Sequence, residues 1–443
     1  MAQTSPILTA LSPTATVARK PRTIVLCFDG TSNEYGTHNT NVVKFFSLLK
    51  KDRTDEQICY YQAGVGTYFQ PGVVSPLFRR VATILDQAVA WYLSAHVMDG
   101  YRFLMQNYNV GDKVCMFGFS RGAYTARALA GMLHKIGLLL KDNEAQLPFA
   151  YRLFTREDPA SVPIAAGFKR TFCRAVPIEF LGVWDTVASV GLFSGKTLPF
   201  VTTNTTIKTF RHAMALDERR AKFRANYYHR PVEGPFPRSR VGTFVHSAKE
   251  GLSLLNRTRR SMRVRAKILK DMSVVDLSED SVYRTDAKEV WFVGGHGDVG
   301  GGVASDTDDF PLSNISLRWM VREAIRAQCS IQFDSAALSR LHIPLSGPDI
   351  ERDVREIEQP VYDALTEAKT WWLLEYIPTK YTYQKTTSNK WVSEWWCAFH
   401  LGEGRGIPDG PLLHESVKRR MDNEKMKYTP RARWKVGTET YVD

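Results

Sequence analysis

The chain has 443 residues, of which 44% are hydrophobic and 12% aromatic, and its formal net charge is +13. This length accommodates one large α/β domain with insertions or two domains, and the apolar content is ample for a sizeable core. No apolar run approaches the roughly 20 residues of a bilayer-spanning helix. The N-terminus lacks the basic start and apolar stretch of a secretory signal. We therefore expect a cytoplasmic protein whose residues 1–20 form a disordered tail.

The spacing of the cysteines and the distribution of charge limit the possible kinds of ligand. The six cysteines are scattered without a C-x-x-C pair, so neither a zinc site nor a disulfide framework is indicated, and we expect no metal or cofactor. A cluster of seven cations favours anionic partners, including an acidic phospholipid surface at which contact would be peripheral. The alternative is a solvated insertion whose charge mainly aids solubility. No nucleic-acid-binding module is recognisable, so nucleic acid is not an expected partner. The seven cations are Arg257, Arg259, Arg260, Arg263, Arg265, Lys267 and Lys270.

Strand and helix patterns alternate along much of the chain. Residues 23–28 form a β-branched and aromatic run that ends in Asp29-Gly30-Thr31, which predicts a strand and a tight turn. Alternating strands and helices indicate an α/β fold, with a mostly parallel central sheet covered by helices on both faces. The other predicted strands are residues 56–62, 178–184 and 290–293, and the predicted helices are residues 41–49, about 81–106 and a segment from about 315.

A G-x-S-x-G motif follows another short apolar run, in the sequence Val114-Cys115-Met116-Phe117-Gly118-Phe119-Ser120-Arg121-Gly122-Ala123. Strand, abrupt turn and helix in this order form a nucleophile elbow, which strains the serine and lifts its hydroxyl above the sheet edge. The two glycines avoid collisions where strand and helix meet. The alternative is a glycine-flanked turn serine without chemistry. The helical spacing that follows and the partners downstream favour a catalytic Ser120.

A catalytic serine needs a base, and the base needs an acid that orients it. In α/β hydrolases the chain order is serine, acid and histidine, each beyond the end of a strand. Asp185 follows the strand at 178–184, and His296 lies in a glycine-rich loop after the strand at 290–293. We predict these two residues as acid and base. The alternatives are a helix N-cap or turn role for Asp185 and a loop histidine satisfied by neighbouring backbone.

Two competitors exist for these roles. His212 is the alternative base, in a segment at 211–220 that we interpret as a helix with apolar and charged faces. A histidine there is more often structural, so His212 ranks second. Asp298 could orient His296 in place of Asp185, but we favour its holding the glycine loop through backbone contacts.

An oxyanion hole needs two preorganised N–H donors. One should be the backbone N–H of Arg121, directly after the nucleophile. The other should come from the turn after the first strand, where Gly30 and Thr31 are the candidates and Asp29 braces the turn. The same turn is typical of phosphatases with an aspartyl nucleophile, but here Cys27 occupies the nucleophile position, where that chemistry needs a carboxylate.

The second half of the chain departs from the simple alternation. Residues 231–276 contain prolines, basic residues and weak periodicity, and we interpret them as a basic insertion over the edge of the sheet that carries the site. Residues 345–430 form an aromatic-rich C-terminal part, whose tryptophans form either core, which we favour, or an apolar groove. We predict a single hydrolase domain over 21–430. The tryptophans in question are Trp371, Trp372, Trp391, Trp395 and Trp396.

Several motifs resemble one family in their sequence and order. Among them are Phe28-Asp29-Gly30-Thr31, Gly118-Phe119-Ser120-Arg121-Gly122-Ala123, Gly182-Val183-Trp184-Asp185-Thr186-Val187, Ala215-Leu216-Asp217-Glu218-Arg219-Arg220 and His296-Gly297-Asp298-Val299-Gly300-Gly301. This chain resembles the α/β hydrolases related to the catalytic domain of type VI secretion phospholipase effectors. The resemblance covers about residues 23–421 and implies a triad of Ser120, Asp185 and His296. Gly297 departs mildly, because the family usually has serine or alanine after the histidine.

The leading hypothesis is a serine esterase or lipase-like hydrolase that cleaves acyl esters through an acyl-enzyme. The resemblance implies phospholipids as a substrate class, met at an anionic membrane through the basic insertion. The alternative is a catalytically inactive hydrolase fold that binds anionic partners.

Overall fold

An eight-stranded sheet forms the centre of the molecule, and every neighbouring pair of its strands is parallel. The predicted α/β class with a largely parallel sheet is therefore confirmed. The strand order is β12-β11-β8-β7-β6-β3-β1-β2. The strands are β1 (Thr23–Phe28), β2 (Gln57–Gln62), β3 (Lys113–Phe119), β6 (Ile178–Trp184), β7 (Ile207–Ala215), β8 (Asp286–Phe292), β11 (Leu412–His414) and β12 (Thr440–Val442). The structure, a computed structural model, describes residues 20–30, 35–64, 93–156, 158–187, 198–201, 204–228, 285–344, 350–376, 379–384, 391–396 and 400–443.

The apolar runs became the central strands. All six residues of β1 are buried, as expected for a parallel strand covered on both faces. The range predicted for β1 and the range predicted for β6 match the observed strands. Strand β8 begins four residues earlier than the apolar run at 290–293, because its charged start is paired within the protein. Lys288 Nζ lies 3.1 Å from Glu323, and Asp286 lies 2.6 Å from Arg211.

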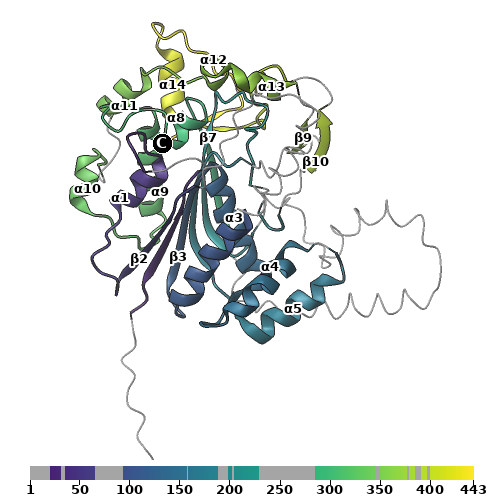
Figure 1. Ribbon diagram of the computed structural model, residues 1–443. Helices are drawn as coiled ribbons and strands as arrows, with labels where there is room; N and C mark the ends of the chain where they lie inside the picture. Colours follow the sequence, from purple (N-terminus) through teal and green to yellow (C-terminus); the bar gives the residue numbers. More distant parts are fainter. Residues whose placement is uncertain are drawn as a thin grey trace, which may run out of the picture.

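Helices cover both faces of the sheet (Figure 1). Helices α1 (Asn41–Leu48) and α9 (Ser313–Arg326) pack on one face, where one large hydrophobic cluster lies. Helix α3 (Ser120–Ile136) and a helical segment at 93–107 pack on the other face. Helices α4 (Leu147–Thr155) and α5 (Ser161–Phe172) extend this second cluster from the side of α3.

The segment at 211–220 is not the helix that its pattern suggested. Its first five residues complete β7, and the backbone N–H groups of Leu216 and Asp217 bond to the carbonyl oxygens of Phe292 and Gly294. The strand lies between β6 and β8, so its charged residues must find partners inside the protein. Arg211 pairs with Glu323 and Asp286, and the ring of His212 is bonded on both sides. These tertiary partners allow a strand where the sequence alternates irregularly.

The C-terminal part of the chain lies above the carboxyl edge of the strands and also completes the sheet (Figure 1). Strand β12 lies beyond residue 430, the predicted end of the domain. The small elements are β4 (Leu138–Leu139) paired with β5 (Cys173–Arg174), and the hairpin of β9 (Thr379–Gln384) and β10 (Trp391–Trp396). The remaining helices are α8 (His296–Gly300), α10 (Ser335–Arg340), α11 (Ile350–Ile357), α12 (Ala364–Glu367), α13 (Trp372–Glu375) and α14 (Glu415–Asp422), with 3₁₀ turns at Glu144–Gln146 and Lys369–Trp371.

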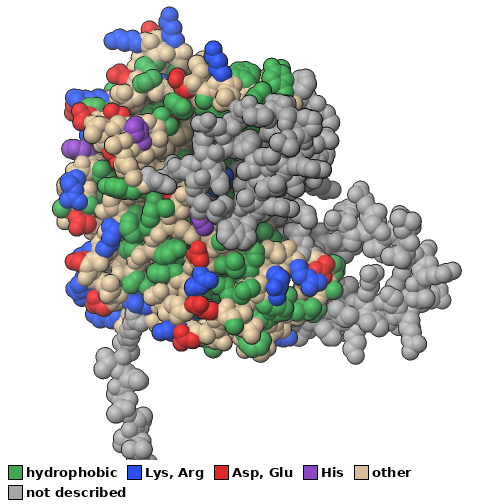
Figure 2. Space-filling model, viewed as in Figure 1, with side chains coloured by type: hydrophobic (Ala, Val, Ile, Leu, Met, Phe, Trp, Pro, Cys, Tyr) green, Lys and Arg blue, Asp and Glu red, His purple; other side chains and the backbone are tan. Residues whose placement is uncertain are grey.

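Two predictions fall outside the described residues: the disordered tail before residue 20 and the basic insertion at 231–276. On the face shown in Figure 2, basic and acidic side chains are interspersed over the described surface. Three large apolar side chains of α4 and α5 are exposed, namely Phe149, Ile164 and Phe172. Among the helices that the structure describes, none combines the length and apolar character needed to cross a bilayer.

The sheet has a topological switch point between β1 and β3. The chain leaves β1 through α1 to β2 on one side, and β3 lies on the other side of β1. Because α1 and α3 cover opposite faces, the connections diverge at the carboxyl ends of these two strands, where open parallel sheets bind ligands. Gly30 follows β1 and Ser120 follows β3 at this position.

Candidate active site

Ser120 occupies a sharp turn between β3 and α3. Its φ angle is +57°, a left-handed conformation that is strained for a residue with a side chain. A Cβ on Gly118 would lie 2.6 Å from the carbonyl oxygen of Gly122, and a Cβ on Gly122 would lie 2.2 Å from that of Phe28. Both motif glycines are thus required by close backbone approach. This strand–turn–helix segment, called the elbow below, has the backbone geometry that a nucleophile elbow requires.

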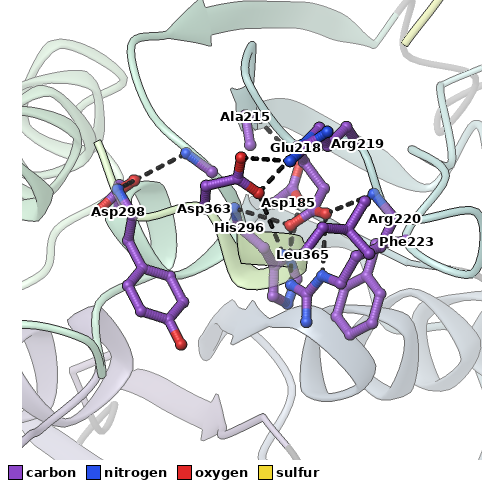
Figure 3. Close-up of polar contacts among 12 residues, drawn as sticks. Asp185, Ala215, Glu218, Arg219, Arg220, Phe223, His296, Asp298, Asp363 and Leu365 are labelled. Carbon is purple, nitrogen blue, oxygen red and sulfur yellow. Dashed lines mark hydrogen bonds and ion pairs between the residues drawn. The ribbon is translucent and has the colours of Figure 1, made fainter. Parts of the chain in front are cut away.

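Asp185 and His296 meet through their side chains. Oδ2 of Asp185 lies 2.6 Å from Nδ1 of His296, and Figure 3 marks this contact with a dashed line. Asp185 directly follows β6, with φ at +34°, and His296 begins α8 just beyond β8. Asp185 is fully buried, and His296 and Ser120 are each 7% exposed. The structure therefore joins an imidazole and a carboxylate that are 111 residues apart.

Asp185 has further partners that keep it ionised. Its Oδ1 accepts a hydrogen bond of 3.0 Å from the backbone N–H of Ala215. The guanidinium of Arg405 binds both carboxylate oxygens, at 2.6 Å to Oδ1 and 2.9 Å to Oδ2. Burial by itself would raise the pKa of Asp185, but Arg405 and His296 together hold it well below its usual range. Burial lowers the pKa of His296, against the opposing influence of Asp185.

Asp298 holds the glycine loop through backbone contacts, whereas Nδ1 of His296 meets Asp185. Its Oδ2 accepts hydrogen bonds from the backbone N–H groups of Gly295, at 2.9 Å, and Tyr362, at 3.0 Å. A second carboxylate, Glu218, accepts from the backbone N–H of His296 at 3.2 Å. Burial raises the pKa of Asp298 to about 7. The loop that carries His296 is thus held by carboxylates on both sides.

His212 lies on β7, where both ring nitrogens are engaged. Nε2 accepts from the backbone N–H of Thr186 at 3.0 Å, and Nδ1 lies 3.0 Å from Oε1 of Glu289. The ring is completely buried. A base with neither nitrogen available has no site at which to accept a proton from a serine. The arrangement is that of a structural histidine beside the acid.

The turn after β1 packs directly against the elbow, but one of its candidate donors is occupied. The backbone N–H of Gly30 donates to Oδ1 of Asp29 at 2.7 Å, so Asp29 braces the turn. Asp29 also accepts from the hydroxyls of Thr40, at 2.9 Å, and Tyr61, at 2.8 Å. Gly30 would have to exchange this partner in order to bind an oxyanion. The other candidate in this turn, Thr31, lies outside the described residues.

Arg121 is the second residue of α3. The first four N–H groups of a helix have no acceptor within it, and here no side chain of the N-cap Phe119 provides one. Among the described residues, no hydrogen bond engages the backbone N–H of Arg121, so this group can donate to a ligand at the sheet edge. Burial lowers the pKa of its own guanidinium to about 10.

Aromatic rings pack against the imidazole of His296. The ring centroids of Phe119 and Phe223 lie 4.6 Å and 4.9 Å from it. Trp371 meets Phe223 edge-on at 5.4 Å, and the Arg220 guanidinium lies 3.4 Å from the Phe223 centroid. Trp371 and its neighbour Trp372 are partly buried and belong to neither core cluster, so the core interpretation is wrong for these two. The side chains of the other three tryptophans lie outside the description.

Two other features do not belong to this site. A cavity of about 490 Å³, lined in part by Arg22, Tyr108 and Arg174, lies at the amino ends of β1 and β3, opposite the elbow. Cys27 is buried in β1, and burial raises the pKa of its thiol. Within the described ranges, no group of three or more His, Cys, Asp or Glu side chains is arranged to hold a metal ion.

The sequence model of the family described as "T6SS, Phospholipase effector Tle1-like, catalytic domain" matches residues 22–323. This chain belongs to the Tle1-like family. The Tle1-like match includes the elbow, Asp185 and His296, and it ends before Arg405.

Three individual proteins are also similar to this Tle1-like chain. An uncharacterised protein of Saccharomyces cerevisiae, YEL023C, is 31% identical over 388 residues, covering 69% of this chain and 57% of its own length. The chain thus spans little more than half of that relative. A crystal structure of an uncharacterised Pseudomonas aeruginosa protein has a TM-score of 0.37 at 18% identity, over 81% of this chain and 53% of the other. The structure of a Tle1 effector bound to the VgrG spike has a TM-score of 0.35 at 15% identity, over 94% and 95%.

Sequence reasoning missed two residues that surround the Asp185–His296 pair. Glu218 is part of a motif that the sequence singled out, but no role followed from it. Arg405 lies 220 residues after Asp185, and its signal in the sequence is weak. It is flanked by Gly404 and Gly406, and a Cβ on Gly404 would lie 1.7 Å from the carbonyl oxygen of Arg431. A glycine-flanked arginine marks a close backbone approach, but it does not reveal the carboxylate partner.

Proposed function

We propose that this protein is a serine hydrolase that cleaves acyl esters through Ser120, His296 and Asp185. The observation that carries the proposal is the 2.6 Å contact between Asp185 and His296 at the same sheet edge as a strained serine in an elbow. A buried carboxylate bonded to Nδ1 keeps the other nitrogen, Nε2, free to accept a proton. A serine is a weak nucleophile without such a base. Membership of the Tle1-like family supports the same chemistry.

The proposed reaction has two halves. Nε2 of His296 takes the Ser120 hydroxyl proton as Oγ bonds to the ester carbonyl carbon, and the carbonyl oxygen becomes an oxyanion near the Arg121 N–H. The tetrahedral intermediate then expels the alcohol, which receives the proton from His296, and an acyl-enzyme remains. Water attacks the acyl-enzyme by the same route, releasing the acid and restoring Ser120. Asp185 stays ionised throughout and stabilises the imidazolium.

We further propose glycerophospholipids as the substrate class, because the family is named for phospholipase effectors. The basic insertion, which lies outside the described residues, would bring the protein to an anionic surface through its positive charge. Parallel assays with short-chain esters, long-chain esters and phospholipid vesicles would identify the preferred class. Binding to anionic vesicles should weaken with salt and with charge reversal at Arg259, Arg260 and Arg263. Binding that does not respond to salt would contradict the membrane part of the proposal.

A fluorophosphonate probe tests the nucleophile directly. Wild-type protein should be labelled once per chain, and the Ser120→Ala variant should not be labelled. Ser335→Ala is the matched control, because this exposed serine at the start of α10 is remote from the elbow. It should be labelled like the wild type. Labelling that persists in Ser120→Ala, or wild-type protein that resists the probe, would refute the assignment.

A further inference from the structure

Arg405, in the C-terminal part of the chain, binds the carboxylate of the proposed acid, Asp185. Arg405 is 8% exposed, and its two terminal nitrogens bind the two oxygens of Asp185 at 2.6 Å and 2.9 Å. A parallel fork of this kind is the strongest arginine–carboxylate geometry. Asp185 is therefore not a free carboxylate that meets only an imidazole. It is shared between a histidine and a permanently charged guanidinium.

Arg405 also connects the acid with the two segments around it. Its Nη1 donates to the carbonyl oxygen of Ala215, at the end of β7, over 2.9 Å. Its Nη2 donates to the carbonyl oxygen of Phe223, whose ring packs against His296. One guanidinium thus fixes the carboxylate, a strand end and the backbone of a residue that packs against the imidazole.

The backbone of Arg405 is itself held in place. The N–H of Arg433 donates to the carbonyl oxygen of Arg405 at 2.8 Å, and the N–H of Ile407 donates back to that of Arg433 at 3.0 Å. The N–H of Ala432 bonds to the carbonyl oxygen of Leu216 at 3.1 Å, which ties this stretch to the end of β7. The arginine is positioned by backbone contacts, so its side chain needs little reordering to meet Asp185.

We infer that Arg405 is a positioning residue that orients Asp185 and tempers its negative charge toward His296. The inference rests on the proposed function, because it assigns a role within that Ser–His–Asp set. An aspartate without a cationic partner stabilises a protonated imidazole more than an aspartate that is already paired with a cation does. Pairing with Arg405 thus favours the neutral imidazole, which is the form that accepts a proton from serine.

Other charged or titratable groups also face this pair. They are Glu218 and Arg220 beside His296, His212 beside Asp185, and Tyr227 beside Arg405. None of them forms a two-point contact with the Asp185 carboxylate among the described residues. Arg405 thus acts on His296 through the Asp185 carboxylate, whereas Arg220 acts on His296 directly.

The test compares pH–rate profiles of the full chain, with a short-chain p-nitrophenyl ester as substrate. Rates are expressed per serine titrated by the fluorophosphonate probe, so that a misfolded fraction does not count. In Arg405→Met the acid limb, which is the decline of kcat/KM at low pH, should shift to a pH about one unit higher. The plateau, which is the constant value of kcat/KM above this limb, should fall about tenfold or more. Arg405→Lys retains the charge without the fork, so its plateau should fall while the limb stays in place.

Arg219→Met is the matched control. Arg219 forms a similar two-point contact with Asp363, at 3.0 Å and 2.6 Å, which is drawn in Figure 3. Its loss should leave both the limb and the plateau unchanged. An Arg405→Met profile that superimposes on the wild type would overturn the inference. If that variant does not fold, Arg405→Lys decides, and an unchanged plateau overturns the inference. Wild-type protein that neither turns over nor is labelled would instead refute the proposed function itself.

Discussion

The backbone N–H of Thr186 donates a 3.0 Å hydrogen bond to Nε2 of His212. That nitrogen must therefore be unprotonated, and the ring proton must reside on Nδ1, where it faces Glu289. Burial lowers the pKa of His212, which also favours the neutral ring. The residue next to the proposed acid is thus fixed by a histidine that is itself fully occupied.

This contact predicts different outcomes for the two histidines. His296→Ala should lower kcat by about 10⁴-fold or more, because the serine then has no base. His212→Ala should retain turnover, but it should lower the free energy of unfolding by about 1–3 kcal/mol, because the Thr186 N–H is left buried without an acceptor. Steady-state kinetics and urea denaturation of both variants check this. Loss of turnover in a folded His212→Ala variant with an active His296→Ala would exchange their roles.

The pH dependence of activity should reflect the burial of His296. The base must be neutral, and burial disfavours the protonated form, so the pKa of His296 lies below its ordinary value of 6.5. The midpoint of the decline in activity at acid pH should therefore lie below 6.5. A profile of kcat/KM from pH 4.5 to 9 measures this limb. A midpoint clearly above 6.5 would contradict the prediction.

The close approach at the elbow predicts a large cost for one added methyl group. In Gly122→Ala the new Cβ would meet the Phe28 carbonyl oxygen at 2.2 Å, and rigid backbone on both sides leaves little room to relax. We expect a loss of about 3 kcal/mol or more in the free energy of unfolding, at the upper end of overpacking effects. The control is Gly167→Ala in α5, where nothing lies within 4 Å of the new atom. It should gain about 0.5–1 kcal/mol. Equal stability of the two variants would rule out the elbow geometry.

Asp298 makes stability depend on pH. Its pKa is raised from 3.8 to about 7 by burial, so the folded protein binds a proton that the unfolded chain releases. Its contribution to stability is full below pH 3.8 and is lost as the pH rises through about 7. Between pH 5 and pH 8, Asp298→Asn should therefore lose less stability than the wild type does. Its amide oxygen still accepts hydrogen bonds from the backbone N–H groups of Gly295 and Tyr362.

The alanine variant provides the contrast. Asp298→Ala leaves the N–H groups of Gly295 and Tyr362 without their acceptor, and it should be less stable by about 1–3 kcal/mol at every pH. Thermal unfolding of the three proteins at pH 5 and pH 8 would separate the two effects. Identical pH profiles for wild type and Asp298→Asn would show that the carboxyl does not titrate in this range.

Sequence by itself determined the parts of the protein whose signal is local. The continuous apolar runs predicted β1 and β6 over their observed ranges, because a buried parallel strand has no polar face. The elbow was recognisable because steric exclusion of side chains at Gly118 and Gly122 leaves its trace in the residues themselves. The chain order of Ser120, Asp185 and His296 also followed from motifs at strand ends.

Tertiary structure alone decided which distant groups share a charge or a hydrogen bond. The pattern around His212 favoured a helix, and it became a strand because partners from β8 and the turn after β6 satisfy its ring. The turn sequence favours Gly30 as an oxyanion donor, whereas in the structure its N–H is bonded to Asp29. Arg405 reaches Asp185 from 220 residues away, and no spacing in the sequence encodes such a contact. Hydrophobic burial and backbone sterics are read from neighbours along the chain, whereas ion pairing depends on distances that exist only after folding.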